Sequence, residues 1–390
     1  MLFILALLAF FAIALPDAML GVAWPFMRVT FDQPLAAMTL VLPFGVAATV
    51  VSTSGWTWAA DRLGLGRLLT GSVALSAVAL LCCALAPAYW VIVACAVLFG
   101  LSGGAIDAAM NAYAARHFGP RQINFMHAAY GIGAATSPLI VTVVVSSGIS
   151  WRWAYLAVMI IQGALAILFA TSSRRWNEAA AQTRNASPAT PSAAFPDRPR
   201  WRPLPRAVAG LLVAALDCGL ESVVGLWAFV FLLEAVRLQP AVAGVVVSGY
   251  WAALVVGRVL LGSVAERVGT WPVLAAATIM VVTAAALLMS GQPIATAMGV
   301  VLLGLAVAPI YPLLVLTTAE RTTASSVDRL VGFQAAASTL GAVTFASLVG
   351  LIMGANLNGF AYCVLALALL TSGGIWAIKP GQQSSTRSPR

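Results

Sequence analysis

Long apolar segments separated by short polar connections recur along almost the whole chain, and they constrain its fold more than any other feature. A helix needs about 20 mostly apolar residues to cross a bilayer. Backbone groups in lipid must be hydrogen-bonded internally, so such segments are expected to be helices. We therefore predict an all-α membrane protein with twelve transmembrane helices. The predicted helices cover residues 2–27, 36–59, 67–86, 89–115, 123–147, 152–172, 206–234, 240–264, 272–290, 293–318, 329–353 and 358–378.

Composition supports a lipid environment and argues against nucleic acid as a partner. Only 8% of the 390 residues are charged, and 61% are hydrophobic, whereas soluble domains carry about 25% charged residues. The net charge of +9 comes from residues placed between apolar segments, not from one basic patch. The five cysteines lie inside apolar segments without metal-site or disulfide spacing. We expect no cofactor and no bound metal.

The N-terminal apolar segment is predicted to be the first membrane helix, not a cleaved signal. No basic region precedes its first sixteen residues, and apolar character continues past Asp17 to Met27.

One long polar stretch divides the chain into two parts. It is rich in Arg, Ala, Ser and Pro, a composition that cannot form a packed core. The predicted organisation is an N-terminal six-helix bundle at 1–172, a cytoplasmic linker at 173–205, a C-terminal six-helix bundle at 206–378 and a cytoplasmic tail at 379–390.

The distribution of basic residues predicts the orientation. With a cytoplasmic N-terminus, the inner connections and tail carry 17 of the 21 Lys and Arg residues, and the outer connections carry three. The remaining one, Arg258, lies within a helix. This asymmetry obeys the positive-inside rule with both termini in the cytoplasm. The predicted location is the cytoplasmic (inner) membrane.

Two motifs recur at equivalent helices of the two halves. Asp17-x-x-x-Gly21 corresponds to Glu221-x-x-x-Gly225, and Asp61-Arg62-x-Gly64 corresponds to Glu266-Arg267-x-Gly269. Parallel repeats of six helices are typical of transporters in which one half rocks against the other. We therefore predict two pseudo-symmetric bundles.

The second of these motifs carries a family resemblance. Gly55-Trp-Thr-Trp-Ala-Ala-Asp61-Arg62-Leu-Gly64 and Gly262-Ser-Val-Ala-Glu266-Arg267-Val-Gly269 resemble the loop signature of the major facilitator superfamily. The resemblance extends over essentially the whole chain and implies the major facilitator fold. The first copy departs from the family pattern, because Thr57 stands at a position where glycine is expected.

Helices 4 and 5 resemble a narrower group, the fucose/galactose/glucose proton symporters. The residues concerned are Gly100-x-x-Gly103-Gly104-x-x-Asp107-x-x-x-Asn111 and His127-x-x-Tyr130-Gly131-x-Gly133. That group also has an acid in helix 1 and another in helix 4.

Ionisable residues within the membrane are predicted to couple transport to protons. Each costs roughly 2.5–3.5 kcal/mol to insert, so such residues call for a functional explanation. Asp17, Asp107, His127 and Glu221 are the predicted proton-coupling residues, and H+ is the expected coupling ion. Pro16 removes a backbone donor and predicts a break in helix 1 beside Asp17. Structural hydrogen bonding remains an alternative for each, and Asp217 is left open.

Two further sets of candidates follow from position. Polar and aromatic residues at similar depth in the two halves are predicted to bind substrate, namely Trp24, Asn111, Tyr130, Trp227, Tyr311 and Gln334. Charged residues at helix ends or near the cytoplasmic side are predicted to gate the conformational change, namely Asp61, Arg62, Arg67, Arg258, Glu266 and Arg267. Surface ion pairing and topology signalling are the alternatives for the second set.

These patterns favour a monomeric secondary transporter for a small-molecule substrate. With two histidines, one lysine and neither a Gly-x-Ser-x-Gly nor a His-Glu-x-x-His motif, the chain is not expected to be an enzyme. The leading hypothesis is proton-coupled uptake of a sugar or similar polar solute. Proton-driven efflux of drugs or amphipathic metabolites is the nearest alternative, and a non-transporting solute sensor is a remote one.

Overall fold

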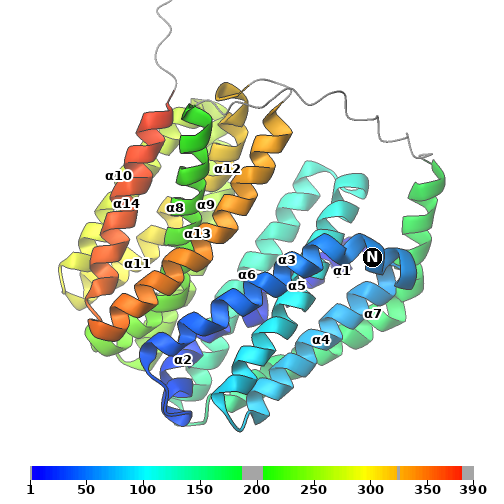
Figure 1. Cartoon of the computed structure of the whole chain (residues 1–390), viewed down its shortest axis with the longest axis horizontal. Helices are drawn as coiled ribbons and strands as arrows, with labels where there is room; N and C mark the ends of the chain where they lie inside the picture. Colours follow the sequence, from blue (N-terminus) through cyan, green and yellow to red (C-terminus); the bar gives the residue numbers. More distant parts are fainter. Residues whose placement is uncertain (1, 187–204, 323–325, 380–390) are drawn as a thin grey trace, which may run out of the picture.

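The computed structural model describes residues 2–186, 205–322 and 326–379, and the elements in these ranges are helical (Figure 1). Twelve of the described helical segments are long and apolar enough to cross a membrane. The first six spans comprise α1 (Leu2–Asp17) with α2 (Met19–Thr30), η1 (Leu35–Ala37) with α3 (Met38–Leu63), α4 (Leu65–Leu85), α5 (Tyr89–His117), α6 (Pro120–Ser146) and α7 (Arg152–Ala186). The second six comprise α8 (Pro205–Val230) with η2 (Phe231–Ala235), α9 (Pro240–Val268), α10 (Thr270–Met289), α11 (Pro293–Val307) with α12 (Ile310–Leu316) and η3 (Thr317–Glu320), α13 (Val327–Ala355) and α14 (Gly359–Ile378).

The two halves use the same helix pairings. In the first half α1 packs on α6, α3 on α5 and α4 on α7. The equivalent helices of the second half pair in the same way, α8 with α13, α9 with α11 and α10 with α14. The predicted pair of six-helix bundles is therefore confirmed.

The repeated acid–arginine motif ends a helix in each half with a glycine. Gly64 follows α3 with φ +81°, and Gly269 follows α9 with φ +92°. Residues with a Cβ rarely adopt this backbone conformation. The motif therefore marks the two places where the chain reverses between the second and third spans of each half.

Proline breaks two of the twelve spans. The first is interrupted at Ala18, directly after Pro16 and Asp17, as the sequence predicts. The tenth was expected to be continuous over 293–318, and this prediction is wrong, because α11 ends at Val307 and α12 begins at Ile310. Pro309 lies in the interruption and lacks the N–H that would continue the helical hydrogen bonds.

The sixth span is longer than predicted. Helix α7 continues from the expected end at residue 172 to Ala186, so the first part of the predicted linker is helical. Trp176 in this extension is fully buried, with its ring centroid 5.0 Å from that of Tyr113. Hydropathy indicates where a helix leaves the lipid, but the helix itself can continue beyond that point. The predicted end of the sixth span is therefore too early. Residues 187–204 and 380–390 lie outside the described residues.

The extension of α7 holds the loop between α3 and α4. The Gly66 amide donates a hydrogen bond to Asn177 Oδ1 at 2.9 Å. A Cβ at residue 66 would lie 2.2 Å from the Ser173 carbonyl oxygen, so the loop is in close contact with α7.

Contacts between the halves, of which α6 with α9 is the largest pair, extend from the middle of the bundle to one end. We name this end, where α2 ends at Thr30 and η2 at Ala235, the Arg28 end. There, a Cβ on Gly21 would lie 2.6 Å from the Leu226 carbonyl oxygen, and one on Gly350 would lie 2.6 Å from Thr39. The opposite end carries the acid–arginine motifs and is named the Asp61 end. The helices of the two halves diverge toward it (Figure 1).

We expect Gly100→Ala to destabilise the first half by about 1–3 kcal/mol, because added volume in a packed interface forces the backbone apart. A Cβ on Gly100 would lie 2.1 Å from the Gly45 carbonyl oxygen on α3. Gly103→Ala is the matched control on the same helix, since its nearest neighbour would be Ile13 Cγ2 at 3.5 Å. Thermal unfolding of both variants in detergent tests the difference. Equal melting temperatures would contradict the close approach.

Candidate functional site

A cavity of about 500 Å³ lies among the helices of the first half. Its volume is within the usual range for sites that bind small organic molecules, about 300–1,000 Å³. Its wall has a polar part and an apolar part. The lining residues with carboxyl, imidazole, guanidinium or hydroxyl groups are Asp17, Thr49, Asp107, His127, Tyr130, Tyr155 and Arg258. The larger apolar ones are Phe10, Ile13, Leu20, Val41, Leu42, Val46, Ile92 and Phe99.

Asp17 lies at the break in the first span and is exposed to this cavity. Its Oδ2 accepts a hydrogen bond from the Tyr130 hydroxyl at 3.1 Å. The two residues come from α1 and α6, which pack on each other. A carboxyl group at a helix break beside a cavity is well placed to exchange a proton.

Asp107 and Asn111 form a hydrogen-bonded pair on α5. The Asn111 side-chain amide donates to Asp107 Oδ1 at 2.9 Å, as the four-residue spacing predicts. Asp107 is exposed and lines the cavity, and Asn111 lies beside it.

His127 of α6 also lines the cavity. Its ring meets Phe10 edge-on, with the centroids 5.2 Å apart. The structure thus places the predicted Asp107 and His127 on the same cavity, between α5 and α6.

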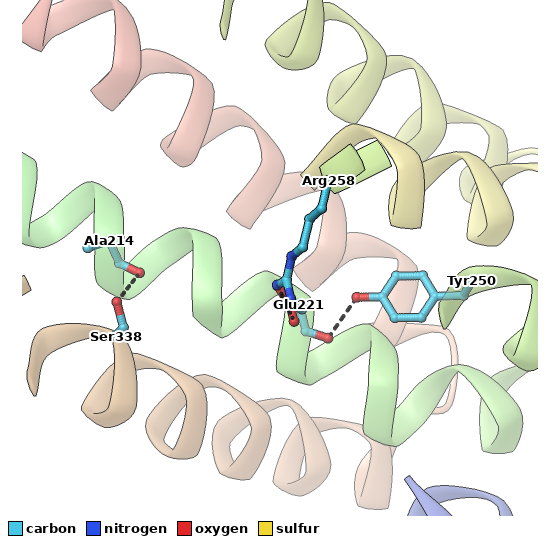
Figure 2. Close-up of polar contacts among 5 residues, drawn as sticks. All are labelled: Ala214, Glu221, Tyr250, Arg258 and Ser338. Atoms are coloured by element: carbon cyan, nitrogen blue, oxygen red, sulfur yellow. Dashed lines mark hydrogen bonds and ion pairs between the residues drawn. The ribbon is translucent and has the colours of Figure 1, made fainter. Parts of the chain in front are cut away.

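Glu221 and Arg258 form an ion pair in the second half, with 3.1 Å between Arg258 Nη2 and Glu221 Oε2 (Figure 2). The Tyr250 hydroxyl donates to the Glu221 backbone carbonyl at 3.0 Å. Both Glu221 and Arg258 lie in the interior of their helices, α8 and α9. Arg258 is the one lining residue that the second half contributes to the cavity described above.

The gating role predicted for Arg258 stays a prediction, and the structure shows that this residue pairs with an acid inside the bundle. Its side chain is committed to Glu221 and reaches the cavity, ten residues before α9 ends at Val268. The sequence did not specify which acid this long side chain reaches, and the structure identifies it as Glu221 of α8.

Three predicted substrate-binding residues do not reach the cavity in this structure. Trp24 and Trp227 are fully buried and donate their indole N–H groups to the carbonyls of Leu35 and Ala346. Gln334 is also buried, and its Oε1 accepts a hydrogen bond from Thr318. Their substrate-binding role stays a prediction, since both indole N–H groups and Gln334 Oε1 already form hydrogen bonds in this conformation.

Tyr311 is half-buried against the main core and does not line the cavity. Of the predicted substrate-binding set, Tyr130 lines the cavity and Asn111 is hydrogen-bonded to a lining residue.

The predicted gating residues at the Asp61 end lie on the surface of the molecule. The Arg62 guanidinium lies over the ring of Trp58, 4.3 Å from its centroid, on the same helix. Arg67, Glu266 and Arg267 are exposed, as is Asp61. Their gating role stays a prediction for other conformations.

Sequence reasoning missed an ion pair that joins the halves at the Arg28 end. Arg28 Nη2 lies 2.9 Å from Glu234 Oε1 and 3.0 Å from Oε2. The two residues are 206 positions apart. The only available signal was that each charge follows an apolar segment, which does not specify a partner.

Breaking this pair is expected to favour the conformation open at the Arg28 end. We expect Arg28→Ala to shift the equilibrium by about fivefold, since a partly exposed pair contributes up to about 1 kcal/mol. Distances between spin labels at the ends of α2 and α8 measure the shift. The charge swap Arg28→Glu with Glu234→Arg is expected to restore the original distribution. An unchanged distribution in Arg28→Ala would show that the pair does not hold this end closed.

Asp217 is a further buried acid, one turn before Glu221. It is fully buried, and neither carboxyl oxygen has a hydrogen-bond partner among the described residues. The sequence left its role open, and its spacing from Glu221 was the only signal.

Twelve helices long and apolar enough to cross a membrane, arranged in two matching halves with a solute-sized cavity, are the architecture of a membrane transporter. The chain belongs to the major facilitator superfamily: the sequence profile described as "Major Facilitator Superfamily" matches residues 6–231. The superfamily resemblance of the loop motifs is thereby confirmed. The resemblance of α5 and α6 to the sugar symporter group stays a prediction.

Similar solved structures share the fold at low sequence identity. A bacterial homolog of the human lysosomal transporter Spinster, in an inward-facing and occupied conformation, aligns with a TM-score of 0.75 and 14% identity, covering 97% of this chain and 96% of that chain. A D-xylose–proton symporter aligns with a TM-score of 0.74 and 14% identity, covering 97% of both chains. The nucleoside transporter NupG aligns with a TM-score of 0.70 and 14% identity, covering 96% of this chain and 97% of that chain.

A sequence relative is the multidrug resistance protein B homolog of Mycobacterium tuberculosis. It is 33% identical over 127 residues, which are 32% of this chain and 23% of that protein. The chain thus matches about a quarter of the relative's length.

Proposed function

We propose that the protein is a proton-coupled transporter that binds a small organic solute in the first-half cavity and releases it by alternating access. The observation that carries this proposal is the exposure of Asp17 and Asp107 to a cavity of about 500 Å³ within the membrane-spanning region. Carboxyl groups are rare in such regions, and those facing a cavity commonly bind coupling ions. The proposal keeps the predicted cytoplasmic membrane location and cytoplasmic termini.

Asp17 is the proposed proton carrier. A proton taken up from one compartment neutralises the carboxylate, and the conformational change then exposes the same group to the other compartment, where the proton leaves. The break between α1 and α2 lies beside Asp17, so a rearrangement there changes its surroundings. Tyr130 holds the carboxyl group through its hydrogen bond.

Arg258 provides a route for coupling between the halves. It lines the same cavity as Asp17 but pairs with Glu221 of its own half. Ionised Asp17 attracts Arg258 across the cavity, whereas protonated Asp17 leaves Arg258 with Glu221. The charge state of Asp17 therefore shifts the equilibrium between two arrangements of the halves.

A sugar or similar polar solute is the leading candidate substrate. The Asp107–Asn111 pair offers acceptors and donors for hydroxyl groups, and Tyr130 offers an aromatic face. A D-xylose–proton symporter shares the fold, which supports the same kind of reaction without identifying the solute.

An amphipathic drug or metabolite is the second candidate, and the apolar part of the cavity wall favours it. Val41, Val46, Ile92 and Phe99 offer a surface suited to an apolar group. The local similarity to a multidrug resistance protein B homolog points in the same direction.

Proteoliposomes loaded with a pH-sensitive dye test the proposal. We expect addition of the correct solute to move protons in a saturable manner that a protonophore abolishes. A panel of hexoses, pentoses, polyols and lipophilic cations distinguishes the two candidate classes. Solute binding without solute or proton flux would instead support the sensor alternative and overturn the transport proposal.

A further inference from the structure

Pro16 leaves a backbone carbonyl of α1 without its helical partner, and α7 supplies a replacement. In a regular helix the N–H at position 16 would bond to the Ala12 carbonyl, but proline has none. The Gln162 side chain donates Nε2–H to that carbonyl at 2.5 Å. Gln162 is only 1% exposed, so its orientation is fixed from within the bundle.

A second and much smaller cavity lies next to this contact, and Asp17 lines it as well as the first one. Its volume is about 10 Å³, close to that of one small occupant. Four of the side chains around it carry oxygen, and the others are apolar. The oxygen-bearing ones are Asp17, Ser76, Ser102 and Gln162.

These oxygen atoms can accept more hydrogen bonds than the surrounding residues donate to them. Gln162 Oε1 and Ser76 Oγ are buried without a hydrogen-bond partner among the described residues. The Ser102 hydroxyl donates a hydrogen bond to the Ser72 carbonyl at 2.7 Å, so the lone pairs of Ser102 Oγ remain available as acceptors. Each buried polar atom without a hydrogen-bond partner lowers the stability of the fold by about 1–3 kcal/mol. An occupant of the cavity that bonds to these atoms would remove this penalty.

Charge points to a cation as that occupant. In this conformation Asp17 makes no ion pair within residues 2–186, 205–322 and 326–379, and Arg258, which shares its cavity, is paired with Glu221. A small monovalent cation balances a single carboxylate, and hard cations prefer carboxylate, amide and hydroxyl oxygens. Broken membrane helices beside a carboxyl group suit such an ion.

We propose that this small cavity is a binding site for one Na+ ion, held by Asp17, Gln162, Ser76 and Ser102. Because the site shares Asp17 with the solute cavity, Na+ and the coupling proton compete for one carboxylate. The site goes beyond the proposed function, and Na+ binding can be measured without knowing the solute.

The test is the thermal unfolding of the purified full-length protein at one alkaline pH and constant total salt, with NaCl exchanged against choline chloride or KCl. We expect Na+ alone to raise the melting temperature in a saturable manner by about 2–4 °C. Ser76→Ala is expected to weaken the apparent Na+ affinity at least about tenfold, and Asp17→Asn is expected to abolish the Na+ effect.

Ser248→Ala is the matched control. Ser248 is another buried serine without a hydrogen-bond partner among the described residues, on α9 and away from this cavity. This variant is expected to keep the full Na+ effect.

Two outcomes overturn the proposal. Equal melting temperatures in Na+, K+ and choline would show that the folded protein does not bind Na+ selectively. A Na+ effect that survives in both Ser76→Ala and Asp17→Asn would place the ion elsewhere. Binding of radiolabelled Na+ to the unmodified protein provides a second readout if Asp17→Asn fails to fold. Neither outcome bears on solute-driven proton movement, so failure here is distinct from failure of the proposed function.

Discussion

Asp17→Asn is expected to reduce solute accumulation from about 50-fold at a membrane potential of 100 mV to about onefold, because one transported charge contributes about 2.3 kcal/mol per 100 mV. Asparagine keeps an oxygen that can accept the Tyr130 hydrogen bond. It cannot bind and release a proton, so the variant should bind solute and exchange it without concentrating it.

Uptake and counterflow in the same proteoliposomes measure this difference. The matched control is Asp107→Asn, which replaces the other carboxyl group that lines the cavity. We expect Asp107→Asn to weaken solute binding while a gradient can still be formed. If Asp17→Asn still accumulates solute and Asp107→Asn does not, the proton carrier is Asp107.

Glu221→Gln is expected to lower the free energy of unfolding by about 2–3 kcal/mol. It leaves the Arg258 guanidinium inside the membrane-spanning region without its carboxylate, and an unpaired charge of this kind costs more than the pair contributed. The side chains of Arg258 and Glu221 are 37% and 20% exposed, so the effect should be smaller than the 3–5 kcal/mol of a fully buried pair.

The double variant Glu221→Gln with Arg258→Gln is expected to recover most of this loss, because no unpaired charge remains. Unfolding of the single and double variants in nanodiscs gives the coupling between the two residues. Glu266→Gln serves as a control, since this exposed acid lies at the Asp61 end of α9, and we expect it to change stability by less than about 0.5 kcal/mol. Equal losses in the single and double variants would show that Arg258 does not depend on Glu221.

Some features of the site were readable from the sequence because they are local. The Asp107–Asn111 hydrogen bond follows from two residues one helical turn apart. The break beside Asp17 follows from the missing N–H of Pro16. Neither inference required knowledge of how the helices pack.

Other features depended on which way each helix faces, and the sequence did not specify this. Trp24 and Trp227 were expected at the substrate, but both are buried between helices and bonded to backbone carbonyls. A helix that is apolar on all sides gives no hydrophobic face from which its orientation could be read. Tyr130 lines the cavity, but its contact with Asp17, 113 residues earlier, could not be derived from the sequence.

The sequence by itself determined the membrane class, the twelve spans and the internal repeat, because hydrophobic length and helix-breaking residues act within one segment. Only the tertiary structure decided which charges meet: Arg28 with Glu234, Arg258 with Glu221, and Gln162 with the carbonyl freed by Pro16. The physical reason is that each of these contacts joins separate helices. Their partners are set by how the helices pack and rotate against one another, and hydropathy carries no information about either.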